Sequence, residues 1–149
     1  MTVTAFSSFD LHPGLARGVA DLGFEVPTPI QCAAIPPALA GRDVLACAMT
    51  GSGKTAAFLL PILNRLIGKP RGTTRALILA PTRELAAQIV EHLEPLAKHT
   101  SLTGAAVYGG VGMTPQEQAF RRGVERGVVP VGVARHRATE VDPHQAASP

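Results

Sequence analysis

The chain is organised around one short stretch, Ala48-Met49-Thr50-Gly51-Ser52-Gly53-Lys54-Thr55. An apolar run, residues 44–48, leads into it, and a helix-like apolar run, residues 56–67, follows it. A strand, a glycine-rich turn that ends in Gly-Lys-Thr and a helix, in that order, are typical of a loop that binds nucleotide phosphates. The stretch therefore predicts a phosphate loop inside an α/β fold.

The residue types in this loop suit that chemistry. Gly51 and Gly53 let the backbone curl so that several N–H groups converge on one anion, and the following helix adds a partial positive charge at its N-terminus. Lys54 is expected to face the β- and γ-phosphates, and the Thr55 hydroxyl to bind Mg²⁺. The strict pattern has Gly at its first position, where this chain has Ala48. The alternative is a surface turn followed by a helix whose lysine is solvated.

Length and composition suit one α/β domain or a part of one. The chain has 149 residues, of which 46% are apolar, and its net charge of +3 is compatible with a nucleic-acid partner without indicating one. Cys32 and Cys47 match no metal or redox spacing, which favours a reducing compartment. Residues 1–10 lack the basic residues of a signal peptide, and the apolar run 56–62 is far too short to span a bilayer. We expect a soluble, cytoplasmic protein.

Helical and strand-like segments alternate along the chain. Their order predicts a parallel sheet with helices on both faces. Residues 124–149 do not continue this alternation. They contain no Leu, Ile, Met, Phe, Tyr or Trp, and they sustain no helical or strand-like period beyond a brief valine run at 128–133. We expect that tail to be mostly disordered. The predicted helices cover residues 11–22, 29–39, 56–67, 83–99 and 115–122, and the predicted strands cover 43–48, 75–80 and 104–108.

Three further sequence blocks narrow the class of protein to which this phosphate loop belongs. Gly-Phe-Glu-Val-Pro-Thr-Pro-Ile-Gln at 23–31, with Phe9 upstream, resembles the Q motif of DEAD-box RNA helicases, and residues 48–55 resemble their motif I, which commonly begins with Ala. Pro-Thr-Arg-Glu-Leu-Ala at 81–86 resembles motif Ia, and a Gly-Gly pair occupies the place of the GG motif. The resemblance covers about residues 6–123.

The resemblance implies ATP and Mg²⁺ as cofactors. Gln31 would read adenine, Phe24 would pack against the adenine ring, and Thr28 belongs to the same motif. The phosphate loop would hold the phosphates, with Lys54 and Thr55 as the catalytic residues and Thr55 as the metal ligand. Without the phosphate loop, residues 23–31 would be read as a helix-capping turn with a core Phe and a solvated Gln.

The resemblance also implies an RNA partner and no membrane. The RNA sugar–phosphate backbone would be contacted without sequence specificity. Thr82 is expected to cap a helix whose N-terminus suits a phosphate. The structural alternative is that the basic–acidic pair at 83–84 only opens the helix. The expected RNA-binding residues are Pro81, Thr82, Arg83, Gly109 and Gly110.

The chain lacks parts that hydrolysis requires. A second strand should end in a carboxylate that holds Mg²⁺, which in the family belongs to the Asp-Glu-Ala-Asp tetrad. The sole Asp after Lys54 is Asp142, in a polar context beside Pro143. The family's Ser-Ala-Thr motif and second domain are missing as well. We therefore expect an incomplete RecA-like P-loop domain over residues 1–123 and a non-homologous tail over 124–149, as a shifted reading frame would produce.

Two functions stay open on these grounds. One is the ATP-binding portion of an ATP-dependent RNA helicase, inactive as this chain alone. The other is a nucleotide-binding remnant that arose by frameshift or truncation and turns nothing over. A different P-loop protein, such as a small-molecule kinase or a transporter ATPase, is disfavoured by the Q-motif and motif Ia blocks.

Overall fold

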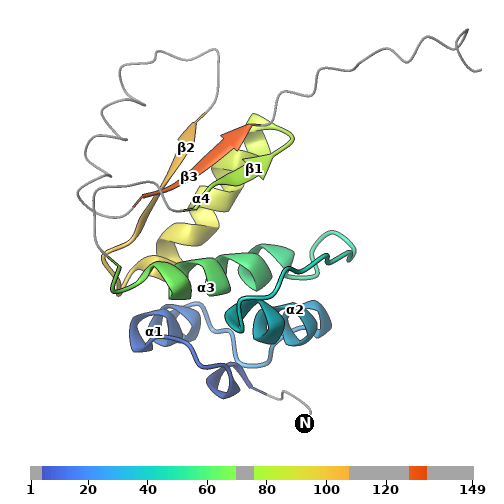
Figure 1. Ribbon diagram of the computed structural model, residues 1–149, viewed down its shortest axis with the longest axis vertical. Helices are drawn as coiled ribbons and strands as arrows, with labels where there is room; N and C mark the ends of the chain where they lie inside the picture. Colours follow the sequence, from blue (N-terminus) through green and yellow to red (C-terminus); the bar gives the residue numbers. More distant parts are fainter. Residues whose placement is uncertain (1–4, 70–75, 108–127, 134–149) are drawn as a thin grey trace, which may run out of the picture.

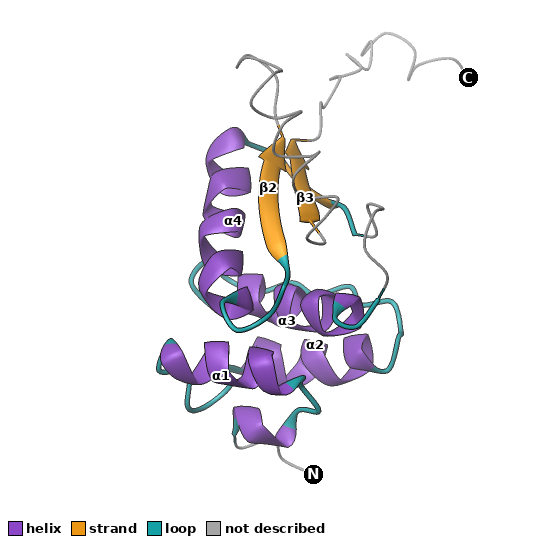
Figure 2. Ribbon diagram, turned by 90° about the vertical axis from the view of Figure 1, so that its left-hand side faces the viewer, coloured by secondary structure: helices purple, strands orange, loops and turns teal. Residues whose placement is uncertain are grey.

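A computed structural model describes residues 5–69, 76–107 and 128–133. In the views of Figures 1 and 2, α1 (Pro13–Asp21), α2 (Pro29–Leu39) and α3 (Lys54–Leu66) lie below a small sheet, and α4 (Arg83–Ala97) lies along one face of that sheet. No helix in the described ranges is both long and apolar enough to cross a bilayer. The elements are η1 (Phe6–Ser8), α1 (Pro13–Asp21), α2 (Pro29–Leu39), α3 (Lys54–Leu66), β1 (Ile78–Ala80), α4 (Arg83–Ala97), β2 (Thr103–Val107) and β3 (Val128–Val133).

The sheet has three parallel strands in the order β1-β3-β2. Ile78 of β1 pairs with Val131 of β3, and Thr103 of β2 pairs with Val128 at the start of β3. The predicted parallel α/β arrangement is confirmed. The expected helix at 115–122 lies outside the described residues, so α4 is the helix that covers the sheet in the described part of the chain.

The valine run at 128–133 corrects our expectation for the tail. We expected residues 124–149 to be mostly disordered, yet Val128–Val133 is the central strand of the sheet. The run sustains no local period in the sequence, and it becomes a strand by pairing with β1 and β2, which lie earlier in the chain. β-branched residues favour such extended pairing. The rest of the tail lies outside the described residues.

The predicted strand at residues 43–48 is wrong. The backbone there forms no strand, and Leu45 is 98% exposed and Val44 41% exposed. An apolar run supplies the preference for an extended chain, but a strand also needs a neighbour that completes its hydrogen bonds. β3, the partner of β1, lies on the other side of β1 in the described sheet, so no neighbour reaches residues 43–48.

The predicted helices that lie in the described residues form with bounds within a few residues of expectation, because their termini carry local signals. Thr28 begins α2 with a capping box, in which its side chain and that of Gln31 satisfy each other's backbone N–H groups. Thr82 Oγ1 accepts a hydrogen bond of 3.2 Å from the Leu85 N–H at the start of α4. α1 is capped by His12, whose Nδ1 accepts from the Gly14 N–H at 3.1 Å.

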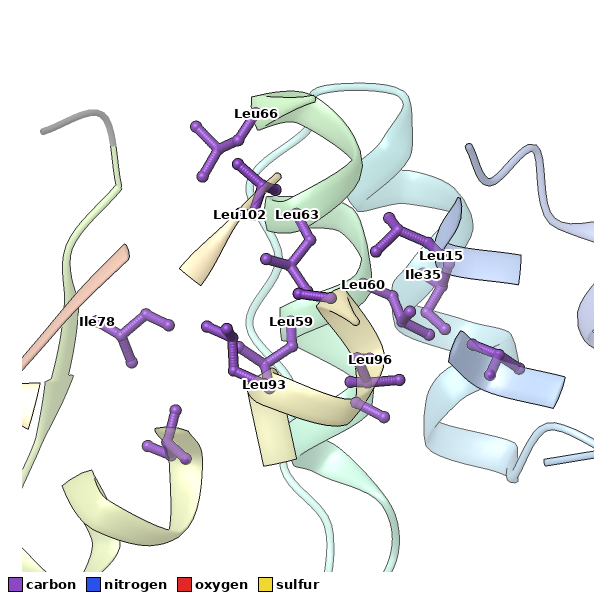
Figure 3. Close-up of a cluster of buried hydrophobic side chains, with 14 of the residues drawn as sticks. Leu15, Ile35, Leu59, Leu60, Leu63, Leu66, Ile78, Leu93, Leu96 and Leu102 are labelled. Carbon is purple, nitrogen blue, oxygen red and sulfur yellow. The ribbon is translucent and has the colours of Figure 1, made fainter. Parts of the chain in front are cut away.

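The core is centred on α3, which lies between the other helices (Figure 3). Leu59, Leu60 and Leu63 are fully buried there. Each large apolar side chain buried in this way contributes roughly 1.5–3 kcal/mol. α1 crosses α4 closely at Gly18, where an added Cβ would lie 2.3 Å from the Leu96 carbonyl oxygen. Because α3 is anchored along its length, its N-terminus is a fixed platform for the loop that precedes it.

Candidate nucleotide site

The phosphate loop ends at Gly53, which is the N-cap of α3. Gly51 has φ +79° and Gly53 has φ +88°, and both values lie in the left-handed region that favours glycine. A Cβ on Gly53 would lie 2.6 Å from Gln31 Nε2 and 3.2 Å from Thr28 Oγ1. Glycine at 53 is therefore required both by the backbone conformation and by the close approach of α2.

Lys54 points back into the loop that precedes it. Its ammonium group donates hydrogen bonds to the backbone carbonyl of Ala48 and, at 2.7 Å, to that of Met49. The lysine is partly exposed, and the carbonyl oxygens are neutral acceptors that a phosphate oxygen can replace. The loop thus holds the Lys54 charge at its own centre, where a bound anion would lie.

Thr28 and Gln31 hold the other side of the loop. Thr28 Oγ1 donates to the Ser52 carbonyl at 2.8 Å, and Gln31 Nε2 donates to the Gly53 carbonyl at 3.2 Å. Gln31 Oε1 accepts from the Thr28 N–H at 2.9 Å, and the side chain is only 4% exposed. The structure therefore brings the Q-motif residues onto the phosphate loop itself.

This arrangement limits what Gln31 can do for a base. An amide group has two N–H donors and an oxygen with two lone pairs. One donor and one lone pair are used inside the protein, so at most one of each remains for a ligand. The contact between Gln31 and adenine stays a prediction.

Phe24 is a partly packed aromatic side chain next to the Q motif. It is 37% exposed, and its ring lies 5.9 Å from the Phe6 ring at an interplanar angle of 30°. Phe6 in turn meets Phe9 edge to face, with centroids 5.7 Å apart. The sequence pattern pointed to Phe9 as the upstream aromatic and left Phe6 out. The spacing Phe6-x-x-Phe9 in an otherwise polar segment is the signal that could have revealed it.

Ser52 carries an unsatisfied polar atom at the loop. Its Oγ is buried and lacks a hydrogen-bond partner in the part of the chain that is described. A buried hydroxyl without a partner costs about 1–3 kcal/mol, and an anion oxygen in the loop would supply that partner. Together with the Gly53 approach and the Lys54 charge, this hydroxyl shows that the residues present fit a bound phosphate.

Thr55 is the residue of the loop that we expect to bind a metal ion. Thr55 lies in the first turn of α3 and is partly exposed. Within the described ranges no cluster of three or more His, Cys, Asp or Glu side chains is placed to hold a metal ion. Mg²⁺ commonly keeps several waters and binds through substrate phosphates plus one or two protein oxygens. The residues present therefore fit Mg²⁺ that arrives with a nucleotide, with Thr55 Oγ1 as the ligand.

The expected RNA-binding residues fall into two groups. Pro81, Thr82 and Arg83 are exposed at the N-terminus of α4, directly after the end of β1. Gly109 and Gly110 lie outside the described residues. The first group has the placement that a backbone phosphate needs, because the helix N-terminus offers free N–H groups.

The geometry of the loop and of the fold around it defines a class of protein. A glycine-rich loop that cradles its own lysine, a helix that starts at Lys54 and a parallel sheet make the chain an α/β protein with a P-loop. The model of the DEAD/DEAH box helicase family matches residues 28–138. The chain belongs to the DEAD/DEAH box helicase family.

Relatives and solved structures agree with this assignment. The ATP-dependent RNA helicase SrmB of Escherichia coli K12 is 54% identical over 123 residues, which cover 80% of this chain and 28% of that protein. The probable ATP-dependent RNA helicase DDX27 of mouse is 47% identical over 119 residues, covering 78% of this chain and 16% of that protein. This chain thus spans less than a third of the length of these relatives.

Two solved structures share the fold. The RNA helicase Prp28 from Chaetomium thermophilum bound to ADP matches with a TM-score of 0.76 and 40% identity, covering 87% of this chain and 32% of that one. A DEAD box protein from Methanococcus jannaschii matches with a TM-score of 0.75 and 33% identity, covering 87% and 34%. The predicted family and the partial RecA-like fold are confirmed. The boundary at residue 123 stays a prediction, and the family match continues beyond it.

Proposed function

We propose that this chain binds ATP with Mg²⁺ at the phosphate loop and supplies this site to ATP-dependent RNA unwinding in a complete DEAD-box helicase. One observation carries the proposal: Thr28 and Gln31 are hydrogen-bonded to the carbonyls of Ser52 and Gly53, directly beside Lys54. The residues proposed for the base and those proposed for the phosphates thus form one connected unit. Support for the nucleotide comes from the related Prp28 structure, which is bound to ADP.

Binding requires an exchange of partners at Lys54. The ammonium group leaves the carbonyls of Ala48 and Met49 and donates to oxygens of the β- and γ-phosphates. Ser52 Oγ gains the acceptor that it lacks. Thr55 Oγ1 would hold Mg²⁺, which would supply positive charge that neutralises phosphate charge. The N-terminal dipole of α3 favours the anion at the same place.

We further propose that these 149 residues bind nucleotide without turning it over. Hydrolysis needs a carboxylate that holds the metal and orients water. After Lys54 the sequence contains Asp142 as its sole Asp, beside Pro143 in a polar segment. The catalytic roles of Lys54 and Thr55 would then be realised in a protein that supplies the missing carboxylate.

The RNA contact and the compartment are also proposals. Pro81, Thr82 and Arg83 at the start of α4, with Gly109 and Gly110, would bind the sugar–phosphate backbone, and the family assignment supports this. Such binding is expected to weaken steeply with salt, because phosphate contacts release counterions. We propose a reducing, cytoplasmic environment, because Cys32 and Cys47 match no metal or redox spacing.

Calorimetric titration of the full chain with Mg²⁺-ATP tests the nucleotide proposal. We expect saturable binding that Lys54→Ala weakens by at least about tenfold, equivalent to about 1.4 kcal/mol. Lys69→Ala is the matched control, because Lys69 is an exposed lysine just beyond the other end of α3. Equal affinity of the Lys54→Ala variant and the wild type would overturn the assignment of the loop.

Two further measurements separate the parts of the proposal. Phosphate release from ATP in the presence of RNA is expected to stay at the level of the Lys54→Ala variant, and RNA-stimulated release above that level would show that the chain is an active enzyme. Gln31→Ala is expected to reduce the preference for ATP over GTP. An unchanged preference would assign Gln31 to holding the loop alone.

A further inference from the structure

Asn64 of α3 joins the helix that follows the phosphate loop to the N-terminal segment of the chain. Its Oδ1 accepts a hydrogen bond of 2.7 Å from the His12 N–H, and its Nδ2 donates one of 3.3 Å to the Asp10 carbonyl. Each end of the amide thus meets a group of the opposite hydrogen-bonding character, which a carboxylate or an apolar side chain at this position could not do. The helix that Lys54 begins therefore holds residues 10–12 in place.

The segment that Asn64 holds is connected to the aromatic side chains beside the Q motif. The Leu11 N–H donates to the Phe9 carbonyl at 2.8 Å. Leu11 also lines a hollow of about 240 Å³ together with Phe6 and Phe24, whose ring centroids lie 5.9 Å apart. A shift of the Asn64-bound segment therefore moves the surface against which the Phe24 ring packs.

Asn64 also places α1, which is the second support of Phe24. His12 is the N-cap of α1, and its carbonyl accepts the first backbone hydrogen bonds of that helix. Beyond the other end of α1, the Phe24 N–H donates to the Val19 carbonyl at 3.1 Å. Leu15 of α1 belongs to the same buried cluster as the leucines of α3 (Figure 3). Both the backbone and the ring of Phe24 are thus connected to α3 through Asn64.

We propose that Asn64 is a positioning residue for the base of the nucleotide, because it holds Phe24 at a fixed place relative to the phosphate loop. This role rests on the proposed function, in which Phe24 packs against adenine and Lys54 binds the phosphates. α3 begins at Lys54 and carries Asn64, so one helix sets the span between the two ends of the ligand. The phosphate side does not depend on Asn64, since Thr28 and Gln31 hold the loop by their own hydrogen bonds.

Two ligands that differ in the base separate positioning from a loss of folding. Mg²⁺-ATP and Mg²⁺-tripolyphosphate are titrated calorimetrically into the full chain and into its Asn64→Ala variant. Alanine is a strong helix former, so α3 is expected to stay intact. We expect ATP binding to weaken at least about threefold, as for the partial loss of one aromatic contact, while the affinity for tripolyphosphate stays the same. Equal losses for the two ligands, or no loss for either, would contradict the positioning role.

The matched control is Arg65→Gln, because Arg65 is the next residue of α3 and is exposed. This variant is expected to leave the ratio of the two affinities unchanged. A change as large as that in Asn64→Ala would assign the effect to the surface of α3 in general. If Asn64→Ala loses its helical circular dichroism, Asn64→Ser, which keeps a short polar side chain, repeats the titration.

A double variant tests whether Asn64 acts through Phe24. Phe24→Ala alone is expected to weaken ATP binding. Adding Asn64→Ala to it is expected to cause no further loss, because residues that act through one contact are not additive. Additive losses would show that Asn64 affects the nucleotide by another route, against the proposal.

Amide hydrogen exchange without nucleotide distinguishes a failure of this role from a failure of the proposed function. In Asn64→Ala the Phe24 N–H is expected to lose protection, while residues 52–55 keep theirs. Unchanged exchange at Phe24 would show that Asn64 does not hold it, whatever the chain binds. Faster exchange together with wild-type ATP affinity of Phe24→Ala would instead contradict the place of Phe24 in the nucleotide site, and the role of Asn64 toward the base with it.

Discussion

The two sides of the phosphate loop differ in how they are held. After Ser52, the chain is fixed by hydrogen bonds from Thr28 and Gln31 and by the buried face of α3. Before Ser52, residues 41–50 are all exposed, and the hydrogen bonds from Lys54 to Ala48 and Met49 hold that side. The half of the loop after Ser52 is thus held by Thr28, Gln31 and α3, whereas the half before it has no strand beside it in the described part of the chain.

The largest expected effect lies on the rigid side. Leu63→Ala removes a fully buried side chain from α3 and is expected to lower the free energy of unfolding by about 2–5 kcal/mol, through lost burial and a cavity. Urea unfolding followed by circular dichroism measures this change. A loss below about 1 kcal/mol, the typical effect of an ordinary substitution, would show that α3 is not the centre of the core.

The next effect tests the approach of α2 to the loop. Gly53→Ala places a Cβ 2.6 Å from Gln31 Nε2 in a left-handed backbone and is expected to cost about 1–3 kcal/mol. Gly51→Ala is the matched control, since Gly51 has a similar φ but no atom within 4 Å of the added Cβ. Comparable losses in the two variants would assign the whole effect to backbone strain and none to the contact with Gln31.

Gln31→Ala tests how much the two hydrogen bonds of the Gln31 side chain contribute to stability. It leaves the Thr28 N–H and the Gly53 carbonyl without their partners, which is expected to cost about 1–3 kcal/mol. Gln88→Ala, at an exposed position of α4, should change stability by less than about 0.5 kcal/mol. Thermal unfolding of the two variants under identical conditions makes the comparison. If the two variants unfold at the same temperature, the hydrogen bonds of Gln31 make no net contribution to the stability of the fold.

The helices were predictable because their signals are local. Thr28 and Thr82 stand directly before the helices that they begin, and the predicted roles of both as caps are confirmed. The strands were harder, because a strand is completed by residues that lie far away in the chain. Residues 43–48 satisfied the local pattern and lacked the neighbour, whereas residues 128–133 had the neighbours without a convincing local pattern.

The sequence predicted which residues form the candidate site, but it did not predict how these residues contact one another. Lys54, Thr28 and Gln31 were found from spacing and from the resemblance to the family. Their mutual arrangement was not, because the direct bonds from Thr28 and Gln31 to the loop depend on how α2 packs against α3. Phe6 was missed for the same reason, since its contact with Phe24 joins two segments on either side of α1.

A smaller effect is expected where α1 meets α4, away from the loop. His99 Nε2 lies 2.7 Å from Asp21 Oδ2, and this hydrogen bond, opposed by desolvation and aided by Lys98, lowers the pKa of Asp21 below 3.8. A carboxyl group with a lowered pKa stabilises the fold above its unfolded value and loses that contribution as pH falls through the folded value. Asp21→Asn should therefore flatten the fall in stability below pH 3.8, measured by unfolding at a series of acidic pH values. A wild-type-like fall in that variant would assign the acid sensitivity to other carboxylates.

The smallest change in stability is expected for a substitution on the exposed side of the loop. This substitution tests most directly whether the two sides of the loop differ in burial. Leu45→Ser changes a side chain that is 98% exposed, so the free energy of unfolding should change by less than about 0.5 kcal/mol. The same substitution in a buried strand would forfeit the burial of a leucine, roughly 1.5–3 kcal/mol. Urea unfolding of this variant beside Leu63→Ala therefore reports whether residues 43–48 are covered in solution. A loss comparable to that of Leu63→Ala would mean that Leu45 is buried in solution, and the contrast between the two sides of the loop would then be wrong.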